Sequence, residues 1–319
     1  MRYQVQHKTT YQYSEPASVA HNLLHLRVPT THRQTVEDFG VIVEPKPRSV
    51  VTRTDYFGNQ VHYFALSEPH NGMTITATSR VAIRPVVPIA SSPNWEELAA
   101  QGRNRAFPLE VRQFLFPSRH IRLLPILVEY GKAAFTRNRP IVEAAMELTT
   151  RIFTDYKYDS NATTINTPLE DVVRQRHGVC QDFAHVGIGA LRALGLPARY
   201  VSGYLRTEPP PGKPRLIGAD ASHAWFSVFC GNELGWIDFD PTNKVMVGTD
   251  HITLANGRDF EDVSPIQGVV MGGGTRTMQV GVDVMPLEAK PAPAASNGTG
   301  QPPSQAQSQS QTPNRGQAS

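Results

Sequence analysis

The sequence predicts an α+β protein, in which an N-terminal antiparallel β domain is followed by a core of helices packed on an antiparallel sheet. Polar and apolar residues alternate over about the first 85 residues and again after about residue 198, as expected for strands with one buried face. Between these regions, at about residues 94–194, apolar residues recur at helical spacing. Strand and helix signals are therefore segregated along the chain, which is the pattern of an α+β fold.

The N-terminal β domain is expected to span residues 1–85. A Gly58-Asn59 pair lies between two strand-like segments, where it favours a hairpin turn. Residues 73–83, with the sequence MTITATSRVAI, predict a further strand. A Pro-rich stretch at 85–93 then predicts a linker, because proline interrupts regular structure.

Residues 86–139 are expected to hold this linker and connecting helices, and residues 140–286 the core. Within the core, the run Thr167-Pro168-Leu169-Glu170 resembles a capping box and predicts the start of a helix. We expect Gly178 to break that helix and a second one to run from about residue 181 to 194. The strands of the core sheet are expected to follow.

The last segment, residues 287–319, is almost wholly Pro, Ala, Ser, Asn, Gly and Gln. Such a composition buries too little apolar area to offset the loss of chain entropy on folding. We expect this tail to be disordered. The Gly272-Gly273-Gly274 run before it is interpreted as a surface loop, with a place at the edge of a cleft as the alternative.

Composition excludes several classes of protein. The 31 basic and 28 acidic residues give a net charge of +3 with no basic run, so we expect no nucleic-acid partner. The two cysteines form no C-x-x-C pair, which suits a reducing compartment, and we expect the cytoplasm. No apolar leader opens the chain and no stretch approaches eighteen apolar residues, so no signal peptide and no membrane association are expected.

Cys180 is the first candidate for chemistry. It lies where a glycine-containing break leads into a helix, and the free N–H groups and macrodipole at a helix start favour a thiolate. The alternative is an inert cysteine in the core, which is how we interpret Cys230. His177 and His185 flank Cys180 and are interpreted as supporting or surface residues.

Two later strands carry candidate partners for this thiol. In ASHAWFSV, alternation places His223 on the face opposite Phe226, and an imidazole is suited to exchange protons with a thiol and a leaving amine. In GWIDFDPT, Asp238 and Asp240 share one face, so either carboxylate could orient the histidine. The alternatives are a structural histidine beside Trp225 and an aspartate that only forms a turn before proline.

Taken in order, these segments resemble the transglutaminase-like superfamily of thiol enzymes. The matching runs are Gly178-Val179-Cys180-Gln181-Asp182-Phe183-Ala184, His223-Ala224-Trp225 and Trp236-Ile237-Asp238-Phe239-Asp240-Pro241-Thr242. The chain is also similar to the bacterial branch, in which a β domain precedes a papain-like core. The resemblance implies that Cys180 is the nucleophile, His223 the general base and acid, and Asp240, at the start of the D-P-T run, the orienting carboxylate.

The implied activity is thiol-dependent amide-bond chemistry on a protein or peptide substrate, through an acyl-thioester on Cys180. The acceptor stays open between water, as in a peptidase or amidase, and an amine, as in a transglutaminase. Hydrolysis is favoured, because transfer requires a site that binds the amine and excludes water. The alternatives are a non-catalytic interaction module and a metal hydrolase, which the lack of closely spaced ligands disfavours. We expect no cofactor and no metal.

Overall fold

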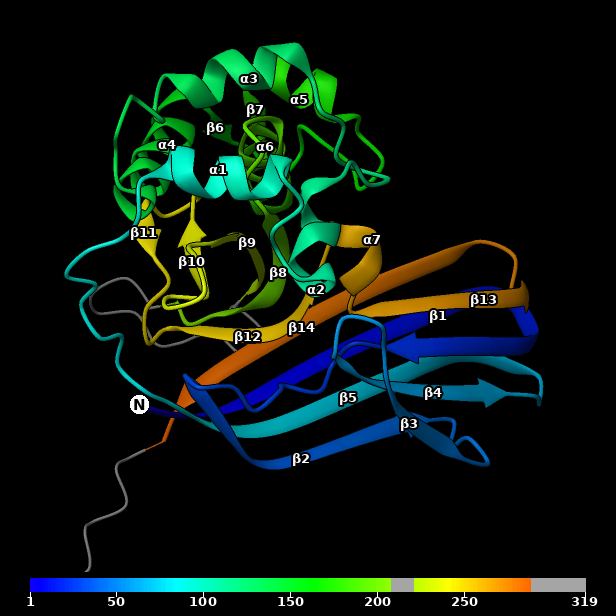
Figure 1. The fold of residues 1–319 in the computed structure, drawn as a ribbon. Helices are drawn as coiled ribbons and strands as arrows, with labels where there is room; N and C mark the ends of the chain where they lie inside the picture. The colour runs from blue at the N-terminus through cyan, green and yellow to red at the C-terminus, as the bar shows by residue number, and fades with distance from the viewer. Residues whose placement is uncertain (208–220, 288–319) are drawn as a thin grey trace, which may run out of the picture. The chain divides into compact units, whose positions relative to one another are not determined.

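The computed structural model describes residues 1–207 and 221–287, and it confirms the predicted α+β class. An antiparallel sheet forms the N-terminal part (Figure 1). Its strands from this part of the chain are β1 (Arg2–Leu24), β2 (Gln34–Glu44), β3 (Val50–Thr54), β4 (Gln60–Leu66) and β5 (His70–Ile83), in the order β2-β5-β1-β4-β3. The Gly58-Asn59 turn joins β3 to β4, as the sequence predicts, with Gly58 at a φ of 86°.

The long strand β1 lies at the centre of this sheet, and the end of the described chain returns to pair with it. Strands β13 (Ile266–Gly272) and β14 (Arg276–Pro286) both run antiparallel to β1. Residues 266–286 were predicted to belong to the core, and their pairing corrects that boundary. The physical reason is that alternation marks a strand without showing which edge it joins.

The three glycines 272–274 form the turn between β13 and β14. All have positive φ, with values of 78°, 83° and 57°, which only glycine adopts without strain. Gly273 donates its N–H to the carbonyl of Pro16, beside an irregularity in β1. This turn therefore belongs to the N-terminal sheet and does not border the candidate site.

A second antiparallel sheet has the order β11-β10-β9-β8-β12. Its strands are β8 (Ala198–Leu205), β9 (Ala221–Phe229), β10 (Trp236–Asp240), β11 (Val245–Met246) and β12 (His251–Gly257). The helical segments are α1 (Trp95–Arg103), α2 (Leu109–Arg112), η1 (Gln113–Leu115), α3 (Pro125–Lys132), α4 (Ile141–Asp155), α5 (Leu169–Gln175), α6 (Cys180–Ala193) and α7 (Phe260–Val263). Helix α6 packs on one face of this sheet, where Phe226 and Phe239 are fully buried among its apolar residues.

The two sheets share a hydrophobic core. Tyr204, Ile252 and Leu254, from the second sheet, are buried with Val5 and Val284 of the N-terminal sheet. The N-terminal sheet and the helices therefore lie on opposite sides of the second sheet, as Figure 1 shows. Packing on both faces therefore holds the strands of the second sheet in place.

The helix boundaries near Cys180 differ from the prediction. Helix α5 begins after Pro168 without any side-chain cap, because Thr167 bonds to Thr164 and Glu170 pairs with Arg122 instead. It ends at Arg176, which adopts the left-handed conformation at a φ of 56°. Gly178 thus follows the break rather than causing it, in the short strand β7 (His177–Gly178), which pairs with β6 (Lys157–Tyr158).

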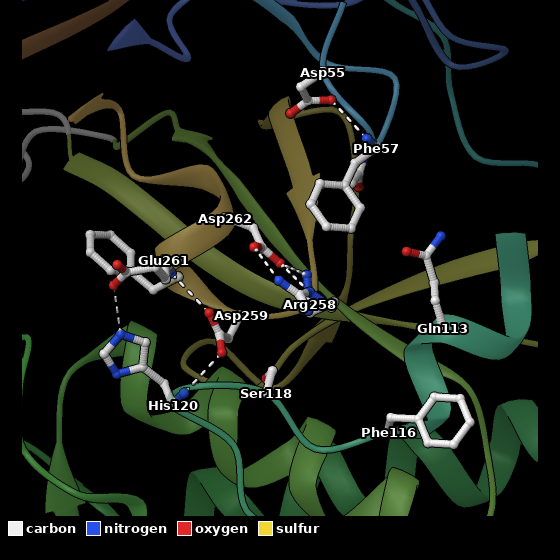
Figure 2. Close-up of polar contacts among 12 residues, drawn as sticks. Asp55, Phe57, Gln113, Phe116, Ser118, His120, Arg258, Asp259, Glu261 and Asp262 are labelled. Carbon is white, nitrogen blue, oxygen red and sulfur yellow. Dashed lines mark hydrogen bonds and ion pairs between the residues drawn. The ribbon is translucent and has the colours of Figure 1, made fainter. Parts of the chain in front are cut away.

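Figure 2 shows a polar junction that joins three parts of the chain. Asp259 caps α7 by accepting the N–H of Glu261 at 2.9 Å, and its other oxygen accepts the N–H of His120 at 2.9 Å. Arg258 pairs with Asp262 at 2.9 Å and lies 5.7 Å from the ring centre of Phe57 in the β3–β4 hairpin. The junction fixes the loop before α7 to the N-terminal sheet and to the segment before α3.

Candidate active site

Cys180 is the first residue of helix α6, and its thiol is partly exposed. Asp182, one turn further on, folds back to accept the N–H of Val179 at 2.8 Å and the hydroxyl of Thr163 at 2.6 Å. The carboxylate occupies the space beside Gly178, where a Cβ would lie 2.5 Å from Asp182 Oδ2. A glycine two residues before the cysteine is therefore required so that the helix start can be capped in this way.

His223 lies on β9 and contacts both of its predicted partners. Its Nε2 lies 2.8 Å from Asp240 Oδ2, and its imidazolium is also stabilised by the nearby side chain of Cys180. Since Nε2 faces Asp240, the nitrogen available to the thiol is Nδ1. The structure thus brings Cys180, His223 and Asp240 together from α6, β9 and β10, in the order that the sequence analysis expects.

Asp240 is fully buried at the end of β10, and both of its oxygens are occupied. Oδ1 accepts the backbone N–H groups of Thr242 and Asn243 at 2.9 and 3.2 Å. Oδ2 accepts from His223, from the side chain of Asn243 at 2.7 Å and from His251 at 2.9 Å. Burial opposes ionisation, but the hydrogen bonds from the two histidines and the charge of His223 hold the pKa of Asp240 well below its ordinary value.

His251, the first residue of β12, is a member of this site that the sequence analysis did not identify. Its Nδ1 accepts the N–H of Gly248 at 3.4 Å, so the ring hydrogen lies on Nε2 and points at Asp240. The ring of His251 packs edge to face with that of Trp225, and the two ring centres are 5.3 Å apart. A lone histidine at the start of a strand carries no motif that would have revealed this contact.

The electrostatics of His223 follow from its two partners. Burial disfavours the imidazolium, but hydrogen bonds and charge interactions with Asp240 and Cys180 outweigh it and raise the pKa of His223 to about 10. At neutral pH the ring is therefore a cation between a thiol and a carboxylate. A protonated imidazole beside a cysteine favours the thiolate, which is the nucleophilic form.

The remaining candidates lie elsewhere. Asp238 is on the same face of β10 as Asp240 but pairs across the sheet with Ser227, not with His223. Cys230 is buried in the core, where burial and the charge of Asp238 raise the pKa of its thiol to about 12. His185 is buried and stacks on His120, so burial lowers its pKa, and it accepts the N–H of Phe260.

One group among the described residues has the composition of a metal site. The ligand atoms of His223, Asp240 and His251 all lie within 4.8 Å of one another. In this arrangement both imidazoles direct Nε2 at the same carboxylate oxygen, so the contacts are those of hydrogen bonds to one acceptor. The Cys180 thiol is not a member of this group.

A cysteine at a helix start, near a histidine held by a buried aspartate on an antiparallel sheet, is the arrangement typical of thiol enzymes of papain-like architecture. Comparison with known proteins identifies the family to which the chain belongs. Residues 3–82 match the bacterial transglutaminase-like N-terminal region, and residues 132–241 match the core of the transglutaminase-like superfamily. An uncharacterized protein of Mycobacterium bovis is 38% identical over 296 residues, covering 90% of this chain and 93% of its own length. The chain belongs to the transglutaminase-like superfamily.

More distant comparisons agree on the fold. An uncharacterized protein of Mycobacterium leprae is 32% identical over 292 residues, covering 90% of this chain and 99% of its own length. A crystal structure from Cytophaga hutchinsonii, provisionally described as a cysteine protease, superimposes with a TM-score of 0.70 at 23% identity, covering 93% of this chain and 95% of that one. Within the described residues no helix has both the length and the apolar character needed to span a bilayer.

Proposed function

We propose that this protein cleaves amide bonds in a protein or peptide through an acyl-thioester on Cys180. The observation that carries the proposal is the position of His223, whose Nε2 hydrogen-bonds Asp240 and whose ring interacts with the side chain of Cys180. Family membership supports thiol-dependent chemistry, and the geometry supplies a role for each of the three residues.

In the first step the Cys180 thiolate attacks the amide carbonyl, and a tetrahedral intermediate forms. The C–N bond then breaks as the His223 imidazolium donates its Nδ1 proton to the leaving amine. The neutral imidazole next takes a proton from the acceptor, which attacks the thioester and releases the thiolate. Asp240 keeps Nε2–H oriented throughout and remains ionised, because both of its oxygens already accept hydrogen bonds.

Water is the proposed acceptor, so that the reaction is hydrolysis. A second candidate is transfer to an amine. It is favoured by a protein-glutamine gamma-glutamyltransferase of Pseudomonas aeruginosa, which is 39% identical over 71 residues, 22% of this chain and 10% of that protein. Peptide and glutamine-donor libraries, incubated with and without a primary amine, distinguish the two by mass spectrometry. If most products were joined to the amine and not hydrolysed, the proposed reaction would be acyl transfer instead of hydrolysis.

The role of Cys180 is tested by the rate of thiol alkylation. We expect fast reaction of wild-type protein with iodoacetamide near neutral pH, because the Cys180 thiol is partly exposed at a helix start and lies near His223. Cys180→Ala should abolish the fast phase, whereas Cys230→Ala should leave it unchanged, since Cys230 is buried and its thiol pKa is raised to about 12. A fast phase that survives in Cys180→Ala would contradict the assignment.

The site is also proposed to work without a metal and in a reducing compartment, the cytoplasm. His223 and His251 each donate a hydrogen bond to Asp240. These hydrogen bonds occupy the ligand atoms that a metal ion would otherwise bind. Metal analysis of the purified protein, together with alkylation rates before and after chelation, checks this. Stoichiometric zinc whose removal changes the rate would overturn it.

A further inference from the structure

A cavity of about 860 Å³ lies on the face of the second sheet that turns away from α6. Part of its lining is the end of β5 and the segment after it, with Ile83, Val86 and Val87, and another part comes from β10 and β11. His251 lines one end, so the cavity reaches the group that surrounds Asp240. A cavity of this volume can accommodate a small organic ligand or the end of a peptide.

Two arginines line this cavity with donors that find no partner. The Nε atoms of Arg33 and Arg199 are buried, and neither has a hydrogen-bond partner in the part of the chain that the structure describes. The Nη2 of Arg33 donates to the carbonyl of Gly248 at 3.0 Å. The guanidinium of Arg199 lies over the ring of Trp236, with its central carbon 4.4 Å from the ring centre.

The sheet register explains why these donors gather. Arg199 on β8, Ser227 on β9 and Asp238 on β10 are directly opposite one another and therefore form one row across the face. The hydroxyl of Ser227 is fully buried and also has no partner. Asp238 acts on both guanidiniums through its charge, but it forms no direct ion pair with either among residues 1–207 and 221–287.

Unpaired buried donors are costly, so a native protein that retains them in a cavity indicates a missing acceptor. The lining carries Arg33, Arg84 and Arg199 against Glu233 and Asp238, which leaves an excess of one positive charge. That balance matches a monoanion better than a phosphate dianion, which the two carboxylates would repel.

We propose that this cavity binds a carboxylate carried on an apolar group, with the carboxylate between Arg33 and Arg199. The fork of a guanidinium matches a carboxylate in shape, and Trp236 holds that of Arg199 in place. Val86, Trp236 and Met246 provide apolar surface for the rest of the ligand. The ligand is either the carboxyl end of an apolar peptide or a small aliphatic acid.

Calorimetric titration of the full chain tests this site. The host is Cys180→Ala, which prevents turnover and makes the result independent of the proposed hydrolysis. The probes are an acetylated tripeptide that ends in leucine with a free carboxylate, its C-terminal amide, and hexanoate. We expect the amide to bind at least about 10-fold more weakly than the free acid, as loss of a charge-assisted hydrogen bond predicts. Tighter binding of the tripeptide acid than of hexanoate assigns the site to a peptide end, and the reverse to a small acid.

Arg199→Met removes the charge and keeps the stem, and it should weaken binding of the free acid about 10-fold or more. The matched control is Arg53→Met, an equal change of charge at an exposed position of β3, which should bind like the host. Without ligand, Arg199→Met should unfold at the same temperature as the host or higher, because an unpaired charge is removed. If Arg199→Met does not fold, Arg33→Met takes its place. Equal affinity for acid and amide, or a destabilised variant with unchanged affinity, would overturn the proposal.

Discussion

At the scale of single residues, Asp240 determines how the site is oriented. A buried carboxylate with both oxygens occupied cannot rotate without losing hydrogen bonds, so it holds the rings of His223 and His251 in fixed positions. Asp238, on the same face of β10, was the rival for this role in the sequence. Its neighbour across the sheet is Ser227, and only the strand register reveals the difference.

Replacement of the two aspartates tests the assignment. Asp240→Asn should lower turnover by about 10⁴-fold, as removal of an orienting carboxylate does in the serine triad, because an amide would present a donor to His223 Nε2. The matched variant Asp238→Asn should retain most of the activity. The measurement is the turnover number on the amide substrate, with circular dichroism to verify the fold. If the two variants ranked in the opposite order, Asp238 would be the orienting residue.

The raised pKa of His223 predicts how stability depends on pH. The ordinary pKa of 6.5 applies to the unfolded chain, whereas in the folded protein it is about 10. The folded state thus binds the proton more tightly, so this contribution is fully present below about pH 6.5 and is lost as pH rises through about 10. Urea unfolding at pH 6, 8 and 10 should show a decline in wild type that His223→Gln reduces. Parallel declines in both proteins would show that other groups cause it.

At the scale of elements, the start of α6 is built by three residues that act together. Asp182 caps the helix, Gly178 leaves room for its carboxylate, and the cap positions Cys180 at the first turn. The sequence predicted a break and a helix here. It assigned the break to Gly178, whereas the structure shows that this glycine is required by a close side-chain contact.

Gly178→Ala is expected to disturb this element. The added Cβ would lie 2.5 Å from Asp182 Oδ2 and 2.9 Å from Asp182 Cβ, so the cap must shift. We expect a loss of about 1–3 kcal/mol in the free energy of unfolding, typical of overpacking, and slower alkylation of Cys180. Gly40→Ala, where an added Cβ meets nothing within 4 Å, is the matched control and should change neither. Two indistinguishable variants would show that the cap does not depend on this glycine.

Much of each element could be predicted from the sequence, because it depends on neighbours in the chain. Alternation identified the strands that carry His223 and Asp240, and the order of the motifs indicated which residues meet. Contacts between segments that are far apart in the sequence could not be predicted in this way. His251 reaches Asp240 because β12 lies at one edge of the second sheet and the chain turns back at Gly248, and no local pattern encodes that.

At the scale of the whole molecule, the N-terminal sheet depends on the last strands described. Tyr3 to Tyr13 of β1 pair with β14, whose Val282 and Val284 are buried in the core shared by the two sheets. The N-terminal sheet in turn covers Ile252 and Leu254 of the second sheet. The segments that carry Cys180, His223 and Asp240 are therefore supported by both ends of the described chain.

A pair of truncations tests this dependence. A chain that ends at residue 265 lacks β13 and β14 and should lose cooperative unfolding or become insoluble, because one edge of β1 and the side chains around Val284 are exposed. A chain that ends at Leu287 retains both strands and should match the full protein in melting temperature and in alkylation of Cys180. The tail predicted for 287–319 lies, except for Leu287, outside the described residues. A stable, soluble chain ending at 265 would contradict the prediction.

The same closure of β1 affects how the protein is made. Synthesis delivers β1 first and its partner β14 only after almost every other described residue has left the ribosome. Until then β1 has one open edge, which can pair with a strand of another nascent chain. Contacts of such long sequence separation also form slowly. In a crowded polysome, yield should therefore depend on protection of this edge during translation, and slower initiation or a co-expressed holdase chaperone should raise the soluble fraction.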